Sequence, residues 1–344
     1  MTKPRPITIL HPKRTTIATV VLFFCLTLSP TPASEKLTLY AFEQPHMGTL
    51  FRIKLYADSK ENAQIAATAA FNRIADLDAK LSDYIPDSEL KQLGAAPPNQ
   101  AVPLSVDLFN VLEAALNFAE STDGRFDPTI GYASNLWRRS LRKGILPTPE
   151  QLADAKSHSG HHNLALDHEN RSATLKIEGM FLDLGGIAKG FAADEALKIL
   201  NEHNITRAAV AAGGDIRTGD PPPHAPDGWK IPVLGIDRNA EIVTTTVHLK
   251  NAAISTSGDR EQFVEIDGTQ YAHIIDPKTG LGLTHRVTAS VIAPTATQSD
   301  ALATTLCIVG NLDLDLPDAT HALLITRDTD GRDQVARTDG FPSS

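Results

Sequence analysis

The sequence predicts an α+β fold in which largely antiparallel sheets are flanked by helices. The clearest helical periodicities occur before residue 160. After residue 160, short strand-like runs follow one another at hairpin-like spacing, with only two helical segments between them. A doubly wound parallel fold would need strict alternation of strands and helices, so the antiparallel class is favoured. A length of 344 residues suits one large domain or two closely joined ones.

The first half of the chain contains two predicted strands and three predicted helices. They are, in order, strands 37–44 and 49–57 and helices 59–82, 105–122 and 148–157. A turn at Pro45–Gly48 joins the two strands. In the first helix, apolar residues recur at spacings of three and four, and Ser59 can cap its start. Ser105 can cap the second helix, and Pro149 suits the first turn of the third.

The second half is rich in strands. They are expected at 172–178, 207–212, 230–236, 242–249, 262–266, 287–293 and 321–327, with helices near 187–203 and 297–309. The proline-rich segment TGDPPPHAPDG predicts a surface loop. The chain after Arg327 is polar, so residues 331–344 are expected to form a polar C-terminal tail. The main domain is therefore expected to span residues 34–330.

The first 33 residues have the composition of a secretory signal peptide. Four basic residues and no acidic residue precede the apolar run TTIATVVLFFCLTLS, and the segment PTPAS follows it. This order predicts export with cleavage after Ala33, and an uncleaved membrane anchor is the alternative. Cys25 follows bulky residues at 22–24, which argues against a lipoprotein. The expected location is periplasmic, or anchored to the outer side of the inner membrane.

Charge and cysteine content disfavour several classes of protein. Removal of residues 1–33 takes away four positive charges, so the net charge changes from −9 to −13. Such an acidic protein is not expected to have nucleic acid or an anionic membrane face as its main partner. Cys307 would remain as the one cysteine, which cannot form an internal disulfide, and its apolar surroundings predict a buried residue. No His/Cys spacing suits a zinc site.

Two glycine-containing segments could let a ligand approach the backbone. In DLGGIAKGFAAD, Asp183 to Asp194, two glycines separate a strand end from a helix start, where backbone N–H groups and Lys189 suit a phosphate. Strand-to-helix turns also carry glycines for structural reasons, so both interpretations stay open. In AAVAAGGDIRTGD, a β-bulge or hairpin explains Gly213 and Gly214 more simply than a ligand does.

Two further segments carry residues suited to chemistry. Asp300 and Thr304 are four residues apart on a predicted helix, so their oxygens share one face and could bind Mg²⁺. Stabilisation of the helix dipole by Asp300 and a hydrogen bond from Thr304 to the preceding turn are the structural alternative. In YAHIIDPKTG, His273 could be a general base, because imidazole side chains ordinarily titrate near neutrality, or it could make a structural hydrogen bond.

In combination, the segments resemble the ApbE family of FAD:protein FMN transferases. The matching segments are HMGT, LSDYIPDSEL, GRFDPTIG, DLGGIAKGFAAD, GGDIR, ISTSGD, YAHIIDPKTG and SVIAPTATQSDALATTL. They follow the order of the family and span roughly residues 40–310. Eight ordered motifs are far more specific than any one of them.

The resemblance implies an ApbE-like fold with a nucleotide cleft between sub-regions, and an enzyme that requires Mg²⁺. Family members move the FMN half of FAD onto a Thr or Ser hydroxyl of an acceptor protein through a phosphoester bond and release AMP. FAD is therefore implied as the substrate. The implied acceptors are exported or membrane-tethered flavoproteins of electron-transfer or respiratory complexes, which agrees with the predicted signal peptide.

The resemblance also implies individual roles. Binding of the flavin nucleotide is implied for Met47, Tyr84, Arg125, Phe126, Asp127, Asp183, Lys189, Thr256, Ser257 and Ile274. The implied metal ligands are the carbonyl of Gly186 and the side chains of Asp300 and Thr304. His273 matches the position that takes the proton from the acceptor hydroxyl. Arg260 stands where the family more often has an aromatic residue, which bears on the roles of Thr256 and Ser257.

Two other functions compete with flavin transfer. A Mg²⁺-dependent FAD pyrophosphatase, giving FMN and AMP, would use the same site with water in place of the acceptor hydroxyl. A non-enzymatic flavin-binding protein needs neither base nor metal, so His273, Asp300 and Thr304 argue against it. Tyr84 favours transfer, because an aromatic side chain there would hold FAD until an acceptor arrives.

Overall fold

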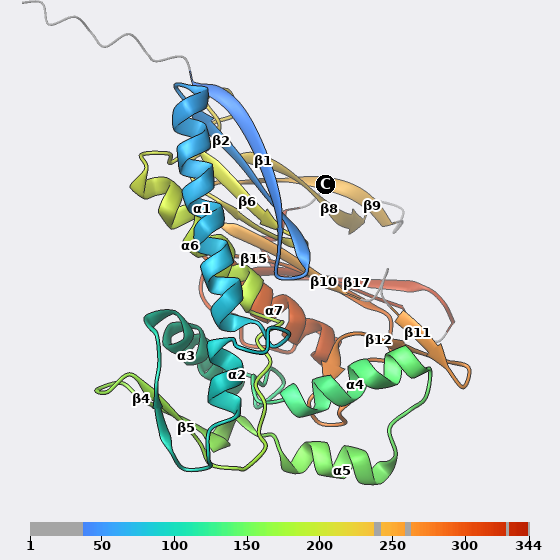
Figure 1. The fold of residues 1–344 in the computed structure, drawn as a ribbon. Coiled ribbons are helices and arrows are strands. Elements are labelled where there is room, and N and C mark those ends of the chain that lie inside the picture. Colours follow the sequence, from blue (N-terminus) through green and yellow to red (C-terminus); the bar gives the residue numbers. More distant parts are fainter. Residues whose placement is uncertain (1–36, 237–241, 259–262, 328–329, 343–344) are drawn as a thin grey trace, which may run out of the picture. The chain divides into compact units, whose positions relative to one another are not determined.

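A sheet of eight strands forms the centre of the computed structural model (Figure 1). Its order is β1-β2-β6-β7-β10-β15-β16-β17, and every neighbouring pair is antiparallel. The strands are β1 Thr38–His46, β2 Thr49–Ala57, β6 Ala208–Ala212, β7 Asp215–Thr218, β10 Ala253–Gly258, β15 Val287–Ala293, β16 His321–Arg327 and β17 Asp333–Arg337. The α+β class predicted from hairpin-like spacing is confirmed.

The structure describes residues 37–236, 242–258, 263–327 and 330–342. The predicted signal peptide and Arg260 lie outside the described residues. Among the described residues, no helix is both long and apolar enough to cross a bilayer.

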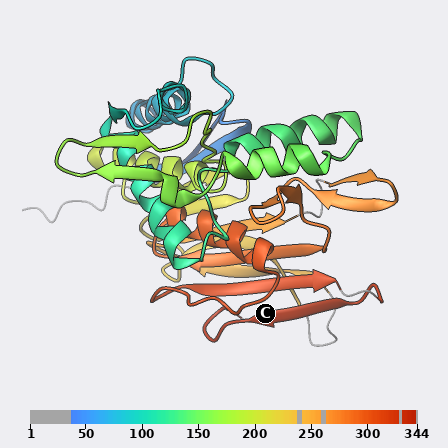
Figure 2. The same cartoon turned by 90° about the horizontal axis from the view of Figure 1, so that it is seen from below.

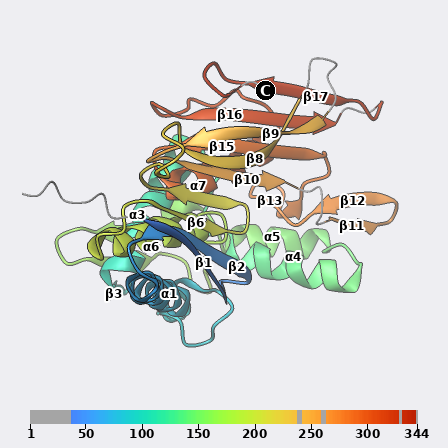
Figure 3. The same cartoon turned by 90° about the horizontal axis from the view of Figure 1, so that it is seen from above.

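Two layers cover the opposite faces of the central sheet. On one face lie α1 Lys60–Leu81, α6 Ala188–Glu202 and α7 Ala296–Val309; on the other lies the hairpin of β8 Trp229–Ile236 and β9 Ile242–Leu249 (Figures 1 and 3). Neighbouring residues of a strand point to opposite faces, so Ala253 packs in the helix-side core and Ile254 in the hairpin-side core. The middle of the sheet, including all of β15, is therefore buried on both sides, whereas Arg52 and Lys54 of β2 are exposed.

Smaller elements complete the fold below the central sheet in Figure 1. They are α2 Glu89–Gly94, α3 Val106–Ser121, α4 Gly131–Lys143, α5 Pro149–Ser157, the 3₁₀ turn His161–Asn163, and the three-stranded sheet of β3 Ala101–Pro103, β5 Ser172–Leu175 and β4 Leu164–Asp167. Two short hairpins are β11 Phe263–Ile266 with β12 Thr269–Ala272, and β13 Ile275–Asp276 with β14 Leu281–Gly282. The α4–α5 and β11–β12 hairpins project to the same side (Figure 2).

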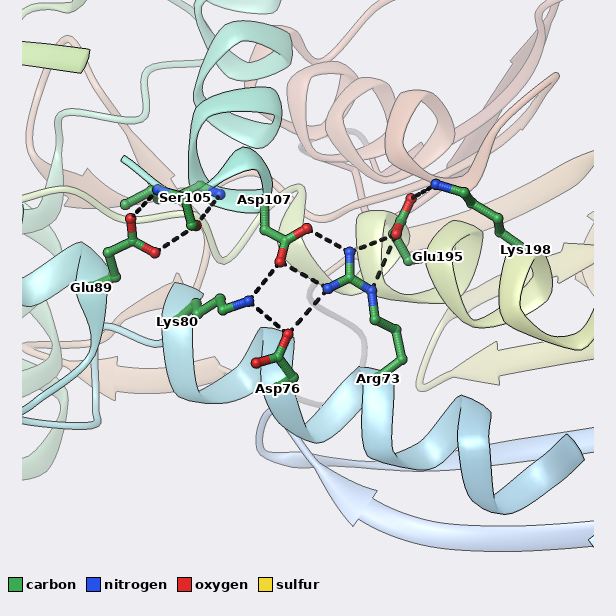
Figure 4. A network of polar contacts seen from close by, with 9 residues as sticks. Arg73, Asp76, Lys80, Glu89, Ser105, Asp107, Glu195 and Lys198 are labelled. Carbon is green, nitrogen blue, oxygen red and sulfur yellow. Dashed lines mark hydrogen bonds and ion pairs between the residues drawn. The ribbon is translucent and has the colours of Figure 1, made fainter. Parts of the chain in front are cut away.

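An ion-pair network joins three helices (Figure 4). Arg73 of α1 donates to Asp107 of α3 at 2.5 and 2.8 Å and to Glu195 of α6 at 2.6 Å. Lys80 of α1 donates to the same Asp107 carboxylate at 2.8 Å. The Asp107 side chain is 12% exposed, so the network is partly shielded from water. It fixes α3 against the helices that cover the sheet.

The five helices predicted from periodicity are all present, with ends shifted by at most two residues. Ser59, Ser105 and Thr148 accept hydrogen bonds from the first turns of α1, α3 and α5. Helix α4 was not predicted, and Ile130 at its N-cap makes no side-chain capping bond that would mark its start. Residues 331–344, expected as a polar tail, contain β17, which pairs with β16 along its length.

Candidate active site

A cavity of about 1090 Å³ opens where the turns of the central sheet meet the end of α1, the start of α6 and the middle of α7. Nine of the predicted site residues line it: Met47, Tyr84, Lys189, Thr256, Ser257, His273, Ile274, Asp300 and Thr304. They come from segments far apart in the chain, so the fold brings them to one place.

Two buried carboxylates share one ammonium at the floor of the cavity. Lys189 Nζ lies 3.1 Å from Asp215 Oδ2 and 3.2 Å from Asp300 Oδ2. Asp300 is 1% exposed and Asp215 is 3% exposed. Burial, together with the charge of Asp215, raises the pKa of Asp300 to about 7 despite Lys189. Burial alone would lower the pKa of Lys189, but the two carboxylates outweigh it and the net pKa is raised.

A glycine lets helices α6 and α7 approach closely at this floor. A Cβ at Gly190 would lie 2.1 Å from the carbonyl oxygen of Ala296, so no side chain fits there. The close approach allows the Gly190 N–H to donate to Asp300 Oδ2 at 3.0 Å. The last glycine of the segment DLGGIAKG therefore has a packing function that also positions a carboxylate.

Asp194 fixes the start of α7. Its carboxylate accepts from the backbone N–H groups of Ala296 and Thr297 at 3.0 and 2.8 Å and from the Thr297 hydroxyl at 2.7 Å. It also pairs with Arg217 Nε of β7 at 2.9 Å. One side chain of α6 thereby holds together the helix that carries Asp300 and the strand that begins with Asp215.

The residues around Asp300 fit a hard divalent cation. The Thr304 hydroxyl makes no hydrogen bond within α7, whereas the Thr305 hydroxyl donates to the carbonyl of Ala301. The hydroxyl oxygens of Thr304 and Ser257 lie 3.4 Å apart. A Cβ at Gly186 would lie 3.3 Å from Thr304 Oγ1, so Gly186 and Thr304 are neighbours at this floor. When both are ionised, the two carboxylates exceed the one ammonium by one negative charge, and carboxylate, hydroxyl and carbonyl oxygens are ligands that Mg²⁺ accepts.

The described residues contain no group of three His, Cys, Asp or Glu side chains placed to hold a metal. Asp300, Thr304 and the Gly186 carbonyl would fill only part of the octahedral shell of Mg²⁺, so a cation there would also take oxygen ligands from outside the protein. Phosphate oxygens of a substrate are such ligands, which is the usual arrangement for Mg²⁺.

Tyr84 and Arg138 form one wall of the cavity. The Arg138 guanidinium lies 4.5 Å from the centre of the Tyr84 ring, which is 72% exposed. Arg138 pairs with Asp83 and, at 3.1 Å, with Asp183. Burial and the charge of Asp183 raise the pKa of Asp83, although Arg138 opposes the shift. The cation fixes one face of the aromatic ring and leaves the other face available to a flat ligand.

Met47 lies at the tip of the β1–β2 turn. The pairing of His46 with Thr49 leaves Met47 and Gly48 as a two-residue loop, and both have positive φ, 49° and 70°. A left-handed backbone is unusual for methionine. Its N–H donates to Asp78 Oδ2 at 2.8 Å, which helps to hold this conformation. The turn holds Met47 at the lining of the cavity.

Helix α4 holds the loop that carries His273 in place through a hydrogen bond. Trp137, which is fully buried, donates its indole N–H to the carbonyl of Ala272 at 3.1 Å. A Cβ at Gly282 would lie 2.1 Å from that carbonyl and 2.6 Å from the indole ring, so only glycine fits between them. His273 is exposed to the cavity, and Ile274 beside it is 8% exposed.

The other predicted site residues do not line the cavity. Asp183 accepts from the Gly185 N–H at 2.8 Å and orients the turn before α6. Phe126 is buried and packs behind Gly186. Asp127 accepts from the backbone of Thr129 and His161, at 2.8 and 3.1 Å. Arg125 is partly exposed in the same loop. The GRFDPTIG segment thus supports the turn before α6 rather than lining the cavity.

Asp215 and Arg138 are among the cavity residues that were not singled out from the sequence. Gly213 and Gly214 form the expected tight hairpin between β6 and β7, and Asp215 follows them at the cavity. The glycine pair before it was the only sequence signal for Asp215. Arg138 carried no signal, because α4 was not predicted.

Comparisons with known proteins agree on one family. The family model described as "ApbE family" matches residues 47–316. An FAD:protein FMN transferase of Haemophilus influenzae is 31% identical over 305 residues, covering 84% of this chain and 86% of that protein. The structure of the flavin transferase ApbE from Vibrio cholerae superimposes with a TM-score of 0.78 at 25% identity, covering 89% of this chain and 98% of that one. The ApbE protein from Thermotoga maritima gives 0.76 at 31% identity, covering 88% and 98%.

Proposed function

The chain belongs to the ApbE family, and from this membership we propose that it transfers the FMN half of FAD to a Thr or Ser hydroxyl of an acceptor protein. The observation that carries the proposal is the meeting of Tyr84, His273 and the Asp300–Thr304 face in one cavity. A flat aromatic surface, an exposed imidazole and an oxygen-rich floor are what a flavin, a hydroxyl and a metal-bound diphosphate require.

The charge of the cavity supports dependence on a divalent cation. FAD brings a doubly negative diphosphate into a lining with more acidic than basic side chains. The lining carries four carboxylates, Asp78, Asp83, Asp215 and Asp300, and two cations, Arg138 and Lys189. An anion would be repelled from this lining unless further positive charge accompanied it.

Mg²⁺ would be held by Asp300, Thr304 and the Gly186 carbonyl, and it would neutralise charge that develops on the diphosphate oxygens. Lys189 contributes a fixed positive charge at the same floor. The Asp194 contacts keep α7 in place, so the ligand atoms need little rearrangement when substrate enters. Met47 and the free face of Tyr84 would bind the isoalloxazine ring.

His273 would act as the general base for the acceptor hydroxyl. The hydroxyl oxygen forms a new bond to the phosphorus of the FMN half, and the bond from that phosphorus to the oxygen of the AMP phosphate breaks. The hydroxyl proton passes to the imidazole, and AMP leaves. A positioned base typically contributes 10²–10⁴-fold to such a step. The hydrogen bond from Trp137 to the carbonyl of Ala272, the residue before His273, limits the movement of the imidazole.

Acceptors are proposed to be flavoproteins of electron-transfer or respiratory complexes outside the cytoplasm. The support is the signal-like composition of residues 1–33, which would bring the enzyme to that compartment. N-terminal sequencing of the protein recovered from the periplasmic and membrane fractions tests both export and cleavage after Ala33.

The decisive experiment combines the protein with FAD, Mg²⁺ and a candidate acceptor domain, and measures acceptor mass and released AMP. Transfer adds one FMN to the acceptor for each AMP released. Free FMN and AMP with an unlabelled acceptor would instead indicate hydrolysis, and neither product would indicate a flavin-binding protein. His273→Ala should keep FAD binding and lose transfer. Asp300→Ala should abolish the response to Mg²⁺, and a normal response would remove Asp300 from the metal site.

A further inference from the structure

Helix α4 is a basic segment in an acidic protein. Between Asp127 and Glu150 the chain has four basic residues and no acidic residue, whereas the whole chain has a net charge of −9. In the part of the chain that the structure describes, the ion pairs of α4 involve Arg138 alone. Arg139, Arg142 and Lys143 are exposed. Their positive charge is therefore presented to solvent.

Helix α4 contacts both Tyr84 and the loop of His273 at the cavity, so its basic residues lie near the candidate active site. One side chain of the helix, Arg138, stacks on Tyr84, and the preceding one, Trp137, bonds the residue before His273. A protein that delivers a hydroxyl to His273 must therefore approach beside α4. The helix and the β11–β12 hairpin project to the same side and pack together through Trp137 and Tyr271 (Figures 1 and 2).

The basic residues are close enough to contact such a protein. Arg142 and Lys143 follow Trp137 by five and six residues, which is about 8–9 Å along a helix axis. Arg142 is near enough to Tyr84 to affect its pKa, which burial raises and the arginines oppose. Ile145, directly after the helix, is 65% exposed and supplies an apolar contact.

We propose that Arg139, Arg142 and Lys143 of α4 form the docking face for the acceptor protein, and that they bind acidic residues flanking its target hydroxyl. The proposal rests on the proposed transferase function, because it names the partner of that reaction. Charges at the rim of an interface mainly raise the association rate, and salt weakens them. The acceptor should therefore be recognised more tightly at low ionic strength.

The structure also separates this role from binding of FAD. The positively charged side chains that line the cavity are Lys189 and Arg138, and neither belongs to the docking face. Reversal of the three exposed charges should therefore change FAD affinity far less than it changes affinity for the acceptor.

The test uses the FAD-loaded protein and two fluorescent peptides, each with one threonine, flanked by aspartates in one and by asparagines in the other. The variants are Arg139→Glu/Arg142→Glu/Lys143→Glu and a matched control, Lys54→Glu/Lys60→Glu/Lys250→Glu, which reverses three exposed lysines outside α4. Peptide affinity is measured by anisotropy at low and high salt, and FAD affinity by flavin fluorescence.

The wild type and the control should bind the aspartate peptide roughly tenfold more tightly than the asparagine peptide at low salt, and the α4 variant should lose this preference. Equal binding of both peptides by the wild type, or an α4 variant that keeps the preference, would overturn the docking face. So would an α4 variant whose FAD affinity falls as much as its peptide affinity. FMN transfer to the peptides is followed separately by mass: preference without transfer would count against the proposed function and not against the docking face.

Discussion

Replacement of Asp107 by asparagine should destabilise the protein by about 2 kcal/mol at neutral pH. Hydrogen bonds from Arg73 lower the pKa of Asp107 from 3.8 to about 2, against a burial effect that raises it, and Lys80 adds to the lowering. A lowering of this size corresponds to about 2 kcal/mol, at about 1.4 kcal/mol for each pKa unit. For a folded unit of this size, that free energy lowers the melting temperature by about 3 °C.

The sign of the pH dependence follows from the direction of the shift. A carboxyl whose pKa is lowered in the folded state contributes its full stability above the unfolded value of 3.8. It loses that contribution as the pH falls from 3.8 through about 2. The difference in melting temperature between wild type and Asp107→Asn should therefore be constant from pH 7 to about 5 and shrink below pH 4.

Thermal unfolding across this pH range checks the prediction. Glu43→Gln is the matched control, because Glu43 pairs with Arg52 at 3.3 Å with both side chains more than half exposed. Exposed pairs contribute about 0.5 kcal/mol, so this control should barely move the melting temperature. An Asp107→Asn protein as stable as wild type at pH 7 would refute the reasoning, as would a difference that persists unchanged to pH 2.

Three further predictions concern the cavity. Gly190→Ala should cost about 3 kcal/mol and weaken Mg²⁺ binding, because its methyl group would lie 2.1 Å from a carbonyl of α7; unfolding and metal titration measure both effects. Arg138→Lys keeps the charge but cannot both bridge Asp83 and Asp183 and stack on Tyr84, so FAD affinity should fall roughly tenfold, with exposed Arg139→Lys as its control. Met47→Gly should leave stability within about 0.5 kcal/mol, because glycine adopts positive φ freely, yet weaken FAD binding measured by fluorescence.

Local sequence patterns predicted the helices that cover the sheet, because their apolar spacing and caps are encoded within each segment. Strand order could not be predicted, because pairing such as that of β2 with β6 depends on contacts between residues more than 150 positions apart. Helix α4 was missed because its N-terminus has no capping side chain, and its stability comes from packing of Trp137 against β12 and β14.

The candidate residues that meet at the cavity were identified through the combination of motifs rather than through any single residue. Asp300 and Thr304 could be placed on one helix face from their spacing alone. Asp215 and Arg138 could not, because their importance lies in partners from other segments: Lys189 for one, Tyr84 and Asp183 for the other. Their contribution becomes visible only when charges and distances are known.

The cavity also has a consequence for the order in which the protein matures. Its lining runs from Met47 near the start of the folded region to Thr304 in its last helix, so a partly synthesised chain has no complete flavin site. FAD that binds only the finished fold stabilises all of it at once, by an amount that grows with the logarithm of FAD concentration. In a compartment with little free FAD, the supply of its own substrate would then set how long each copy of the enzyme resists unfolding and proteolysis.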